Sequence, residues 1–331
     1  MEPIMIVLIV LALGFDFLNG VHDSSNIVAT MISSRALPPR VALTLTAISE
    51  FCGPFIFGVA VAKTIGDEIV LPGKVDGATL IVALVAALVA AIFWNLFTWF
   101  MGFPSSSSHA LIGGLVGAVV MCAGWDAIRM SGVEKVLLTL LTSPFIGLIV
   151  GFLITRLIML LCWNATPKVN GFFKKGQVLT AISLALSHGA NDAQKSMGII
   201  TLGLVTTGFI DSFKVPLWVI FACATMIAFG TSVGGWKLIR TLGAKFYRIR
   251  PIDGFSTQMT SAVVILGASL FGGPVSTTQV VSSAIMGVGS AERVNKVRWG
   301  VVKEIAIAWL LTIPITALIG AGTFWLISRF I

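Results

Sequence analysis

Charge is what this sequence has least of. Of its 331 residues, 11% are Asp, Glu, Lys or Arg, whereas 56% belong to the apolar set Ala, Val, Ile, Leu, Met, Phe, Trp, Tyr and Cys. Soluble domains carry about 25% charged residues. This composition therefore excludes an ordinary water-soluble enzyme and a disordered chain, and it predicts a protein that is embedded in lipid.

Familiar chemical signatures are missing as well. The four cysteines lie far apart in apolar stretches without metal-ligand spacing, which is typical of packing residues. There is no GxxxxGK(S/T) loop, HExxH helix or GxSxG turn, so we expect no ATP-driven module and no enzyme activity. The net charge of +8 comes with 22 Phe, 9 Trp and a single Tyr. We interpret it as loop charge facing the cytoplasm, with no nucleic-acid partner.

Two long stretches contain no charged residue. They run from Gly77 to Trp125 and from Gly254 to Ala291. At about 20 residues per crossing, the first can hold two membrane-spanning helices, whereas the second is tight for two. The middle of each stretch is a polar, helix-breaking island, GFPSSSSHA at Gly102–Ala110 and GGPVSTTQ at Gly272–Gln279. Each stretch is therefore predicted to form a broken or re-entrant helical hairpin.

The islands belong to an internal repeat. Two further segments match each other, NGVHDSSN at Asn19–Asn26 and HGANDAQK at His188–Lys195. Their aspartates, Asp23 and Asp192, are 192 − 23 = 169 residues apart, and the islands are 272 − 102 = 170 apart. Two motifs in one order at one spacing predict a duplicated chain. We expect a first repeat at residues 1–165, a basic cytoplasmic linker at 166–176 and a second repeat at 177–331.

The charges that flank the uncharged stretches indicate that the repeats are inverted. Acidic and basic residues nearly cancel around the first stretch, which predicts flanks outside the cell, whereas the basic flanks of the second predict the cytoplasm. The expected fold class is an all-α polytopic membrane protein with two inverted-topology repeats. The basic flanks are Lys237, Arg240, Lys245, Arg248, Arg250, Arg293, Lys296, Arg298 and Lys303. Further helices are expected at Ile4–Asp16, Val41–Ala62, Val136–Trp163, Val215–Trp236 and Ile305–Ser328.

Few ionisable groups lie inside the apolar runs. Each costs about 2.5 to 3.5 kcal/mol to insert into a membrane, so those that persist are candidates for function. Asp23 and Asp192 recur at one repeat position beside Gly and Asn, where we expect the helices to break. Together with Asn26 and Asn191 they offer hard oxygen ligands suited to Na⁺, although a buried carboxylate could take up a proton instead. Glu50 is a further candidate.

The serine and threonine islands point to an anion. A proline at a helix start followed by hydroxyls presents backbone N–H groups, the positive end of the helix dipole and O–H donors. Two such islands, one per inverted half, could face each other around a tetrahedral oxyanion. The alternative is that the hydroxyls only cap or pack half-helices. A hydrolase built on Ser105–Ser108 and His109 is disfavoured, because the second island has Gln279 in place of the histidine.

Together these motifs resemble the inorganic phosphate transporter (PiT) family over essentially the whole chain. NGVHDSSN and HGANDAQK are similar to its duplicated GAND-type signature, and PSSSSH and PVSTTQ to its paired Ser/Thr loops. The resemblance implies uptake of inorganic phosphate by symport with a cation, alternating access around a midplane site, and a homodimer in the cell membrane. Na⁺ is the favoured coupling ion and H⁺ the alternative, with no other cofactor expected.

The resemblance also implies roles for particular residues. In sodium-coupled animal members Gln258 is a glutamate and Lys195 an asparagine, which leaves the driving ion open between Na⁺ and H⁺. Phosphate is assigned to Ser105, Ser106, Ser107, Ser108, Ser276, Thr277, Thr278 and Lys195. The cation is assigned to Asp23, Asn26, Glu50, Asn191, Asp192 and Gln258, and supporting roles to His22, His109, His188 and Gln279.

Two other functions stay open. One is a sulfate permease of the same fold. Phosphate near neutral pH keeps an O–H that can donate to a carboxylate, and sulfate has none, so direct contact with Asp23 or Asp192 would favour phosphate. The other is a passive anion channel. Paired intramembrane carboxylates disfavour it, because they would block an anion path unless a coupled cation neutralised them.

Overall fold

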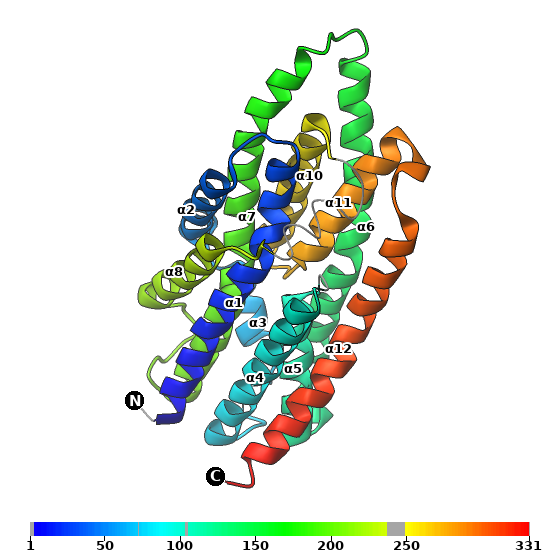
Figure 1. The fold of residues 1–331 in the computed structure, drawn as a ribbon. Coiled ribbons are helices and arrows are strands. Elements are labelled where there is room, and N and C mark those ends of the chain that lie inside the picture. The colour runs from blue at the N-terminus through cyan, green and yellow to red at the C-terminus, as the bar shows by residue number, and fades with distance from the viewer. Residues whose placement is uncertain (1–2, 72, 103–104, 237–248, 331) are drawn as a thin grey trace.

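The computed structural model describes residues 3–71, 73–102, 105–236 and 249–330, and these are almost entirely helical (Figure 1). Within these ranges, the only extended pairing is an isolated bridge between Val70 and Ile128. Short 3-10 turns occupy Trp125–Ala127 and Val294–Lys296. The helices are α1 (Pro3–Ser33), α2 (Pro39–Phe57), α3 (Ala60–Asp67), α4 (Gly77–Met101), α5 (Ser107–Ala123), α6 (Met130–Leu161), α7 (Val169–Thr206), α8 (Leu217–Val233), α10 (Pro251–Leu270), α11 (Thr277–Glu292) and α12 (Trp299–Ile327).

The elements of the two halves correspond and run in opposite directions. The helices α1, α2, α4, α5 and α6 match α7, α8, α10, α11 and α12 in order and kind. In Figure 1, α1 and α6 run upward while α7 and α12 run downward, and both termini lie at the lower end. The hairpin of α4 and α5 fills the lower half and that of α10 and α11 the upper half. The predicted inverted-repeat fold is confirmed.

The two halves are interlocked by reciprocal contacts. Helix α1 packs on α8 and α7 packs on α2, while α5 packs on α12 and α11 packs on α6. Each of these pairs joins a helix of one half to a helix of the other. A two-fold axis that relates the halves requires such pairs, because each contact between the halves then has an equivalent contact in which the two halves are exchanged.

Both hairpins break at their islands, and their second arms are short. The first arm begins at Asp76, where the Thr79 hydroxyl and backbone N–H groups donate to the carboxylate and hold its pKa below its usual range. It ends at Gly102, whose φ of 73° suits glycine.

The second arms start at the N-caps Ser106 and Ser276 and have 17 and 16 residues. At 1.5 Å per residue each is about 25 Å long, less than a bilayer core of about 30 Å, so the hairpins are re-entrant.

The aspartate-bearing motifs do not break their helices, contrary to the expectation from sequence. Both α1 and α7 run without interruption through them. The motif glycines serve close packing instead. A Cβ added to Gly20 would lie 2.1 Å from the Ile227 carbonyl oxygen, and one added to Gly189 would lie 2.1 Å from that of Glu50.

The partner helices contribute glycines to the same two crossings. A Cβ added to Gly230 of α8 would lie 2.0 Å from the Phe17 carbonyl oxygen, and one added to Gly53 of α2 would lie 2.3 Å from that of Leu186. Small residues let membrane helices approach at backbone distance. The α1–α8 and α7–α2 crossings are thus two copies of one glycine-mediated contact.

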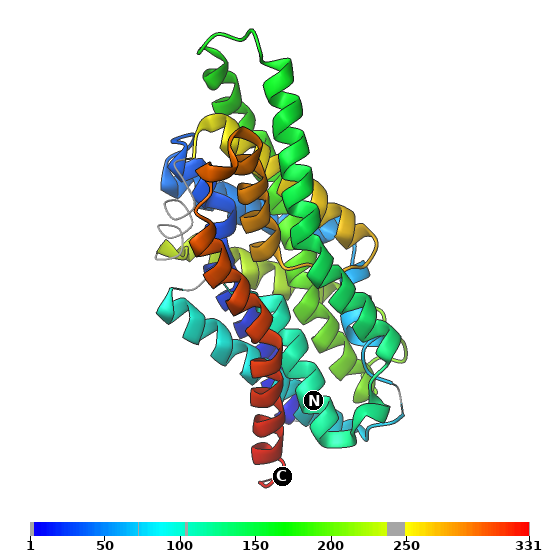
Figure 2. The same ribbon diagram turned by 90° about the vertical axis from the view of Figure 1, so that its right-hand side faces the viewer.

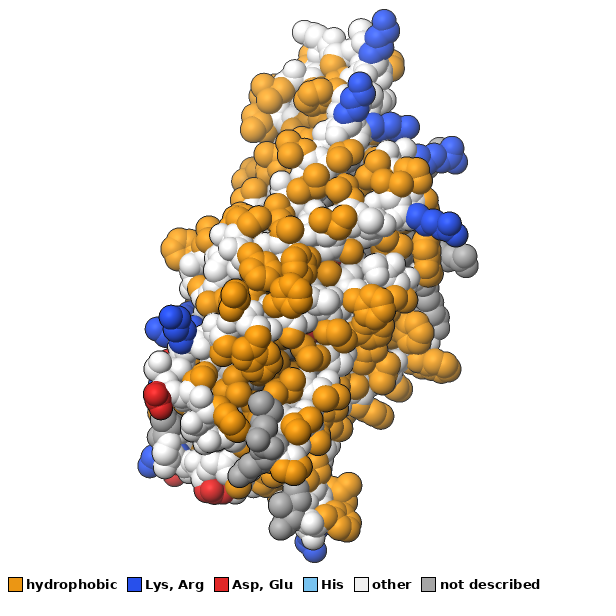
Figure 3. Space-filling model, turned by 90° about the vertical axis from the view of Figure 1, so that its left-hand side faces the viewer, with side chains coloured by type: hydrophobic (Ala, Val, Ile, Leu, Met, Phe, Trp, Pro, Cys, Tyr) orange, Lys and Arg blue, Asp and Glu red, His pale blue; other side chains and the backbone are white. Residues whose placement is uncertain are grey.

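The long helices α6 and α12 lie on the outside; α6 extends over most of the height of the molecule, and α12 runs from below its upper end to its lower end (Figure 2). Their large apolar side chains are exposed, for example Phe145 at 70% and Leu318 at 75%. Figure 3 shows a broad apolar surface, with most of the visible Lys and Arg at the upper end and the rest, together with Asp and Glu, toward the lower end. Five helices of the described ranges are long and apolar enough to cross a membrane. These features define a multi-pass membrane protein.

The bounds of several helices differ from those expected from the sequence. The segment expected at Val41–Ala62 is divided into α2 and α3 at Gly58, where φ is 80°. The helix expected to end at Asp16 continues to the end of α1. Helix α7 begins at Val169, inside the expected linker. The predicted flank residues Lys237, Arg240, Lys245 and Arg248 and the island residue Pro104 lie outside the described residues.

Replacing Gly230 by alanine should weaken the fold, because the added methyl group would overlap the Phe17 carbonyl. Overpacking of this kind costs about 1 to 3 kcal/mol. We expect a lower thermal unfolding temperature for the purified variant in detergent. Gly14→Ala on α1 is the control, since no atom lies within 4 Å of its added Cβ. Equal unfolding temperatures for the two variants would contradict the close packing.

Candidate functional site

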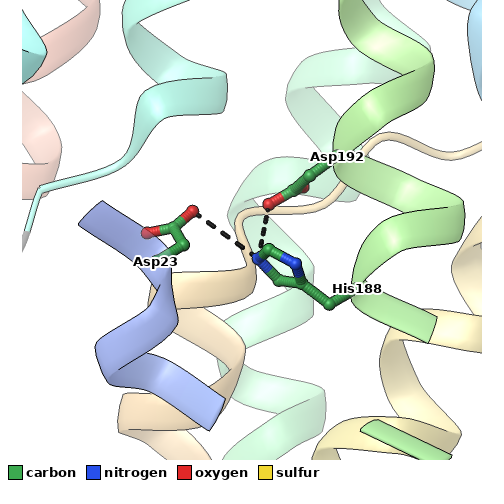
Figure 4. Close-up of side chains that lie close together, drawn as sticks. All are labelled: Asp23, His188 and Asp192. Carbon is green, nitrogen blue, oxygen red and sulfur yellow. Dashed lines mark ion pairs between the residues drawn. The ribbon is translucent and has the colours of Figure 1, made fainter. Parts of the chain in front are cut away.

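Two carboxylates, one from each half, are buried around a single imidazole. Asp23 of α1 and Asp192 of α7 both lie beside His188 (Figure 4). Nε2 of His188 is 2.9 Å from Asp192 Oδ2 and 3.8 Å from Asp23 Oδ2. Its Nδ1 is 2.8 Å from Oε1 of Glu50 on α2. The Thr277 hydroxyl donates to Asp192 Oδ2 at 3.0 Å and to Asp23 Oδ2 at 3.4 Å. The first residue of α11 therefore touches the carboxylates of both halves.

Amide, hydroxyl and imidazole groups surround Asp23. Asn26, one turn further along α1, donates Nδ2 to Asp23 Oδ1 at 2.9 Å, and the Thr278 hydroxyl donates to the same oxygen at 3.0 Å. Nδ1 of His22 lies 3.0 Å from it. Asp23 is fully buried. Its charge is thus met by hydrogen bonds and histidines rather than by a lysine or an arginine.

Asp192 is paired with a buried ammonium group. Lys195, one turn further along α7, contacts Asp192 Oδ1 and donates to the hydroxyl oxygen of Ser108. It also donates to the Val275 carbonyl at 3.2 Å. Lys195 is 1% exposed, and an unpaired lysine would be costly at that depth. The ammonium group therefore ties α7 to both islands, because Ser108 lies in the first turn of α5 and Val275 precedes α11.

The two islands meet each other. The Ser108 hydroxyl donates to the Val275 carbonyl at 3.0 Å, and Nε2 of His109 lies 3.5 Å from Nε2 of Gln279. His109 and Gln279 are counterparts in the repeat, and two counterparts in contact must lie beside the two-fold axis. The N-termini of α5 and α11 therefore converge on this axis. The first N–H groups of each helix have no partner within their own helix and carry its positive dipole end.

Three other island hydroxyls form hydrogen bonds within their own hairpins. Ser106 accepts the backbone N–H of His109 at 3.1 Å, and Ser276 accepts the N–H three residues on at 3.4 Å. Ser105 shares a 2.8 Å hydrogen bond with Thr98 of α4. All seven hydroxyl residues of the islands are at most 2% exposed. Capping thus accounts for one hydroxyl in each island and Ser105 is bound to α4, whereas Ser108, Thr277 and Thr278 contact the facing island or the carboxylates.

Asn191 holds the break in the second hairpin. Its Nδ2 donates to the Ser269 hydroxyl at 2.7 Å and to the Gly273 carbonyl at 3.3 Å, and its Oδ1 accepts the Val275 N–H at 3.2 Å. The sequence grouped this residue with the cation ligands. In the structure its amide group binds the hairpin backbone, and it orients α11 toward the carboxylates.

Gln258 also binds neutral groups. Its amide donates to the Thr30 hydroxyl at 3.0 Å and accepts from Thr180 at 2.7 Å, so it joins α10 to α1 and α7. Sequence reasoning did not single out these two threonines. A signal for one existed, since Thr30 stands seven residues after Asp23 and so on the same helical face.

The two halves place different side chains at equivalent positions. His188 of α7 corresponds to Asn19 of α1. Glu50 corresponds to Ile227, since their carbonyls face the equivalent glycines at the two crossings. The contact between His188 and Glu50 therefore has no counterpart in the other half. A symmetric backbone carries an asymmetric set of charges.

The fold and this cluster define a class of protein, a multi-pass helical membrane protein in which two inverted repeats bring hydroxyl-rich helix starts to a pair of buried carboxylates. Hydroxyls and free N–H groups suit an oxyanion, and carboxylate oxygens suit a hard cation. Ligand atoms of Asp23, His188 and Asp192 all lie within 4.8 Å of one another, close enough to share one ion.

Comparisons with known proteins agree. The model of the Phosphate transporter family matches residues 19–320. The "Probable low-affinity inorganic phosphate transporter" of Bacillus subtilis (strain 168) is 44% identical, over 98% of this chain and 97% of its own length. That of Rhizobium meliloti (strain 1021) is 43% identical, over 96% and 95%. A solved structure titled "The sodium-dependent phosphate transporter" matches with a TM-score of 0.93 and 26% identity over the whole of both chains. The chain belongs to the phosphate transporter family.

Replacing Asn191 by alanine should loosen the second hairpin, because the Gly273 carbonyl and the Val275 N–H lose their partner. A buried group left unsatisfied costs about 1 to 3 kcal/mol. We expect a lower thermal unfolding temperature in detergent. Ser282→Ala on α11 is the control, because within the described residues this buried hydroxyl has no hydrogen-bond partner to lose. An unchanged unfolding temperature for the Asn191 variant would show that the clamp does not stabilise the hairpin.

Proposed function

We propose that this protein takes up inorganic phosphate by symport with a cation. The observation that carries the proposal is the place of Thr277, whose hydroxyl donates to both Asp23 and Asp192 where the helix starts of the two halves converge. Anion donors and cation ligands thus share one buried cluster. A cation bound at the carboxylates would cancel the charge that otherwise repels phosphate, and this links the two binding events.

Phosphate would bind where α5 and α11 begin. Hydroxyls, helix-start N–H groups and the Lys195 ammonium group all donate there, and an ammonium group is a strong point-charge partner for phosphate. A phosphate that keeps one O–H could donate it to Asp23 or Asp192, whereas sulfate could not, and this favours phosphate over sulfate. The proposed ligands are Ser105, Ser106, Ser107, Ser108, Ser276, Thr277, Thr278 and Lys195.

The coupling cation would bind beside Asp23. Besides the carboxylate, the Asn26 side-chain oxygen is available, since it accepts no hydrogen bond within the described residues. The Thr278 hydroxyl donates to Asp23 Oδ1 and accepts from the Asn26 amide nitrogen, so its oxygen lies in the same cluster. These are hard oxygen ligands of the kind that Na⁺ takes. The proton is the second candidate, because His188 contacts Glu50 and Asp192 and could carry it between carboxylates.

The membrane orientation follows from charge. We place the upper end of Figure 1 in the cytoplasm of a cell with this protein in its cell membrane, because the connections there are rich in Lys and Arg. The repeats would then be residues 1–165 and 177–331, joined by a cytoplasmic linker. Asp23, Asp192 and Lys195 are at most 1% exposed, so this conformation is closed to both sides and alternating access requires opening on each side in turn. Family resemblance favours a homodimer, which chemical cross-linking in membranes tests.

Purified protein in proteoliposomes should accumulate radiolabelled phosphate when an inward cation gradient is imposed. Na⁺ and H⁺ gradients are applied separately, and the expected result is uptake driven by Na⁺, with H⁺ as the alternative driver. Arsenate, a near-isostere, should compete, and sulfate should compete less. Uptake that ignores both gradients would point to a passive channel and overturn symport, and equal competition by sulfate would overturn the substrate assignment.

Asp23→Asn and Asp192→Asn should each abolish gradient-driven accumulation, because the neutral amide removes the charge that binds the cation or holds Lys195 in place. The substitution keeps the side-chain shape, and size-exclusion chromatography confirms folding. Asp126→Asn, in an exposed turn of the first half, is the matched control and should transport normally. Wild-type accumulation by either buried variant would contradict a coupling role.

A further inference from the structure

Lys195 occupies in the second half the place that Asn26 occupies in the first. Each is the third residue after its repeat aspartate. Asn26 donates Nδ2 to Asp23 Oδ1 at 2.9 Å, and the Lys195 ammonium group contacts the corresponding oxygen of Asp192. The two nitrogen atoms therefore fill equivalent positions beside the two carboxylates.

Their second contacts are equivalent as well. Asn26 donates to the Thr278 hydroxyl at 3.0 Å, and Lys195 donates to the Ser108 hydroxyl. Ser108 and Thr278 are themselves counterparts, 278 − 108 = 170 residues apart. Each half thus uses the equivalent position to link its aspartate to the facing island. The linking group is a neutral amide in the first half and a cation in the second.

This difference decides what else can bind. The Asn26 amide leaves the charge of Asp23 in place and offers an oxygen as a further ligand. The Lys195 ammonium group has only donors, and it cancels the charge of Asp192. A mobile cation beside that ammonium group would be repelled strongly, because both Lys195 and Asp192 are buried where water screens charge poorly. The second half is therefore closed to a mobile cation.

We propose that Lys195 is a tethered cation that takes the place of a mobile coupling ion at Asp192. Asp23 is then the single site for a transported cation, and each phosphate travels with one such ion. The ammonium group cannot leave the protein, so it neutralises the site in every step of the cycle without contributing to the ion gradient used. The inference rests on the proposed symport and specifies its stoichiometry.

Lys195→Asn tests this directly, because it gives the second half the side chain that the first half already has. Binding of radiolabelled phosphate to the purified full-length protein is measured against Na⁺ concentration, with choline chloride holding the ionic strength constant. Without Na⁺ the variant should bind phosphate about tenfold or more weakly than the wild type. Saturating Na⁺ should restore its affinity, with a Na⁺ dependence steeper by about one ion.

The controls separate charge from structure. Lys195→Arg keeps the tethered charge, so its Na⁺ dependence should be no steeper than that of the wild type even where its affinity for phosphate differs. Lys135→Asn removes a lysine that pairs with Glu68 outside the cluster, at 2.9 Å, and should change nothing. A Lys195→Asn protein that folds but binds no phosphate even at saturating Na⁺ would show that the lysine is only a phosphate ligand. Unchanged binding at all Na⁺ concentrations would also overturn the proposal.

The wild type supplies a second test that does not depend on the variant folding. Its cation-to-phosphate ratio is obtained from the membrane potential and cation gradient at which net phosphate flux in proteoliposomes is zero. One cation per phosphate is expected, and two or more would overturn the tethered-cation role. A wild type that moves no phosphate would instead refute the proposed function itself, so the two failures are distinguishable.

Discussion

The close burial of two carboxylates is the constraint on which the rest of the structure depends. Asp23 and Asp192 share the Thr277 hydroxyl and the His188 imidazole in a protein surrounded by lipid. Two like charges at such separation repel strongly when water is excluded. Every element around them supplies compensation: Lys195 from the same helix as one of them, hydroxyls from two islands and helix N-termini at the axis. The glycine-mediated crossings bring the helices close enough for these short contacts to form.

Inverted repetition provides this arrangement economically, because one hairpin and one crossing are each made twice. Symmetry alone would give two identical sites, however, and the side chains break it. His188, Glu50 and Lys195 stand where the other half has Asn19, Ile227 and Asn26. Lys195 therefore pairs with Asp192 alone, while Asp23 contacts the Asn26 amide and the Thr278 hydroxyl beside the two imidazoles. Two carboxylates at equivalent positions of the repeat thus have different neighbouring side chains.

Much of the fold could be predicted from the sequence, because the repeat spacing, the uncharged stretches and the loop charges each report a global property of a membrane chain. The expected breaks at the aspartate motifs were wrong. A glycine such as Gly20 or Gly189 is compatible both with a helix break and with close helix packing. Only the position of the neighbouring helix backbone shows which of the two occurs. The contacts of Asn191 and Gln258 likewise could not be predicted, because their partners lie far away in the sequence. The repeat did predict which residues would be brought together, but their roles in transport stay predictions.

The reciprocal packing also restricts how the closed site can open. The α1–α8, α2–α7, α5–α12 and α6–α11 contacts all join one repeat to the other. In the first two, backbones touch at glycines, for example Gly53 against Leu186 and Gly230 against Phe17. Separating the repeats as rigid bodies would break all of these contacts at once. The proposed alternating access would therefore have to move groups of helices that each contain elements of both halves. Thr277 and Lys195, which bind across the hairpin starts, lie where such groups would part.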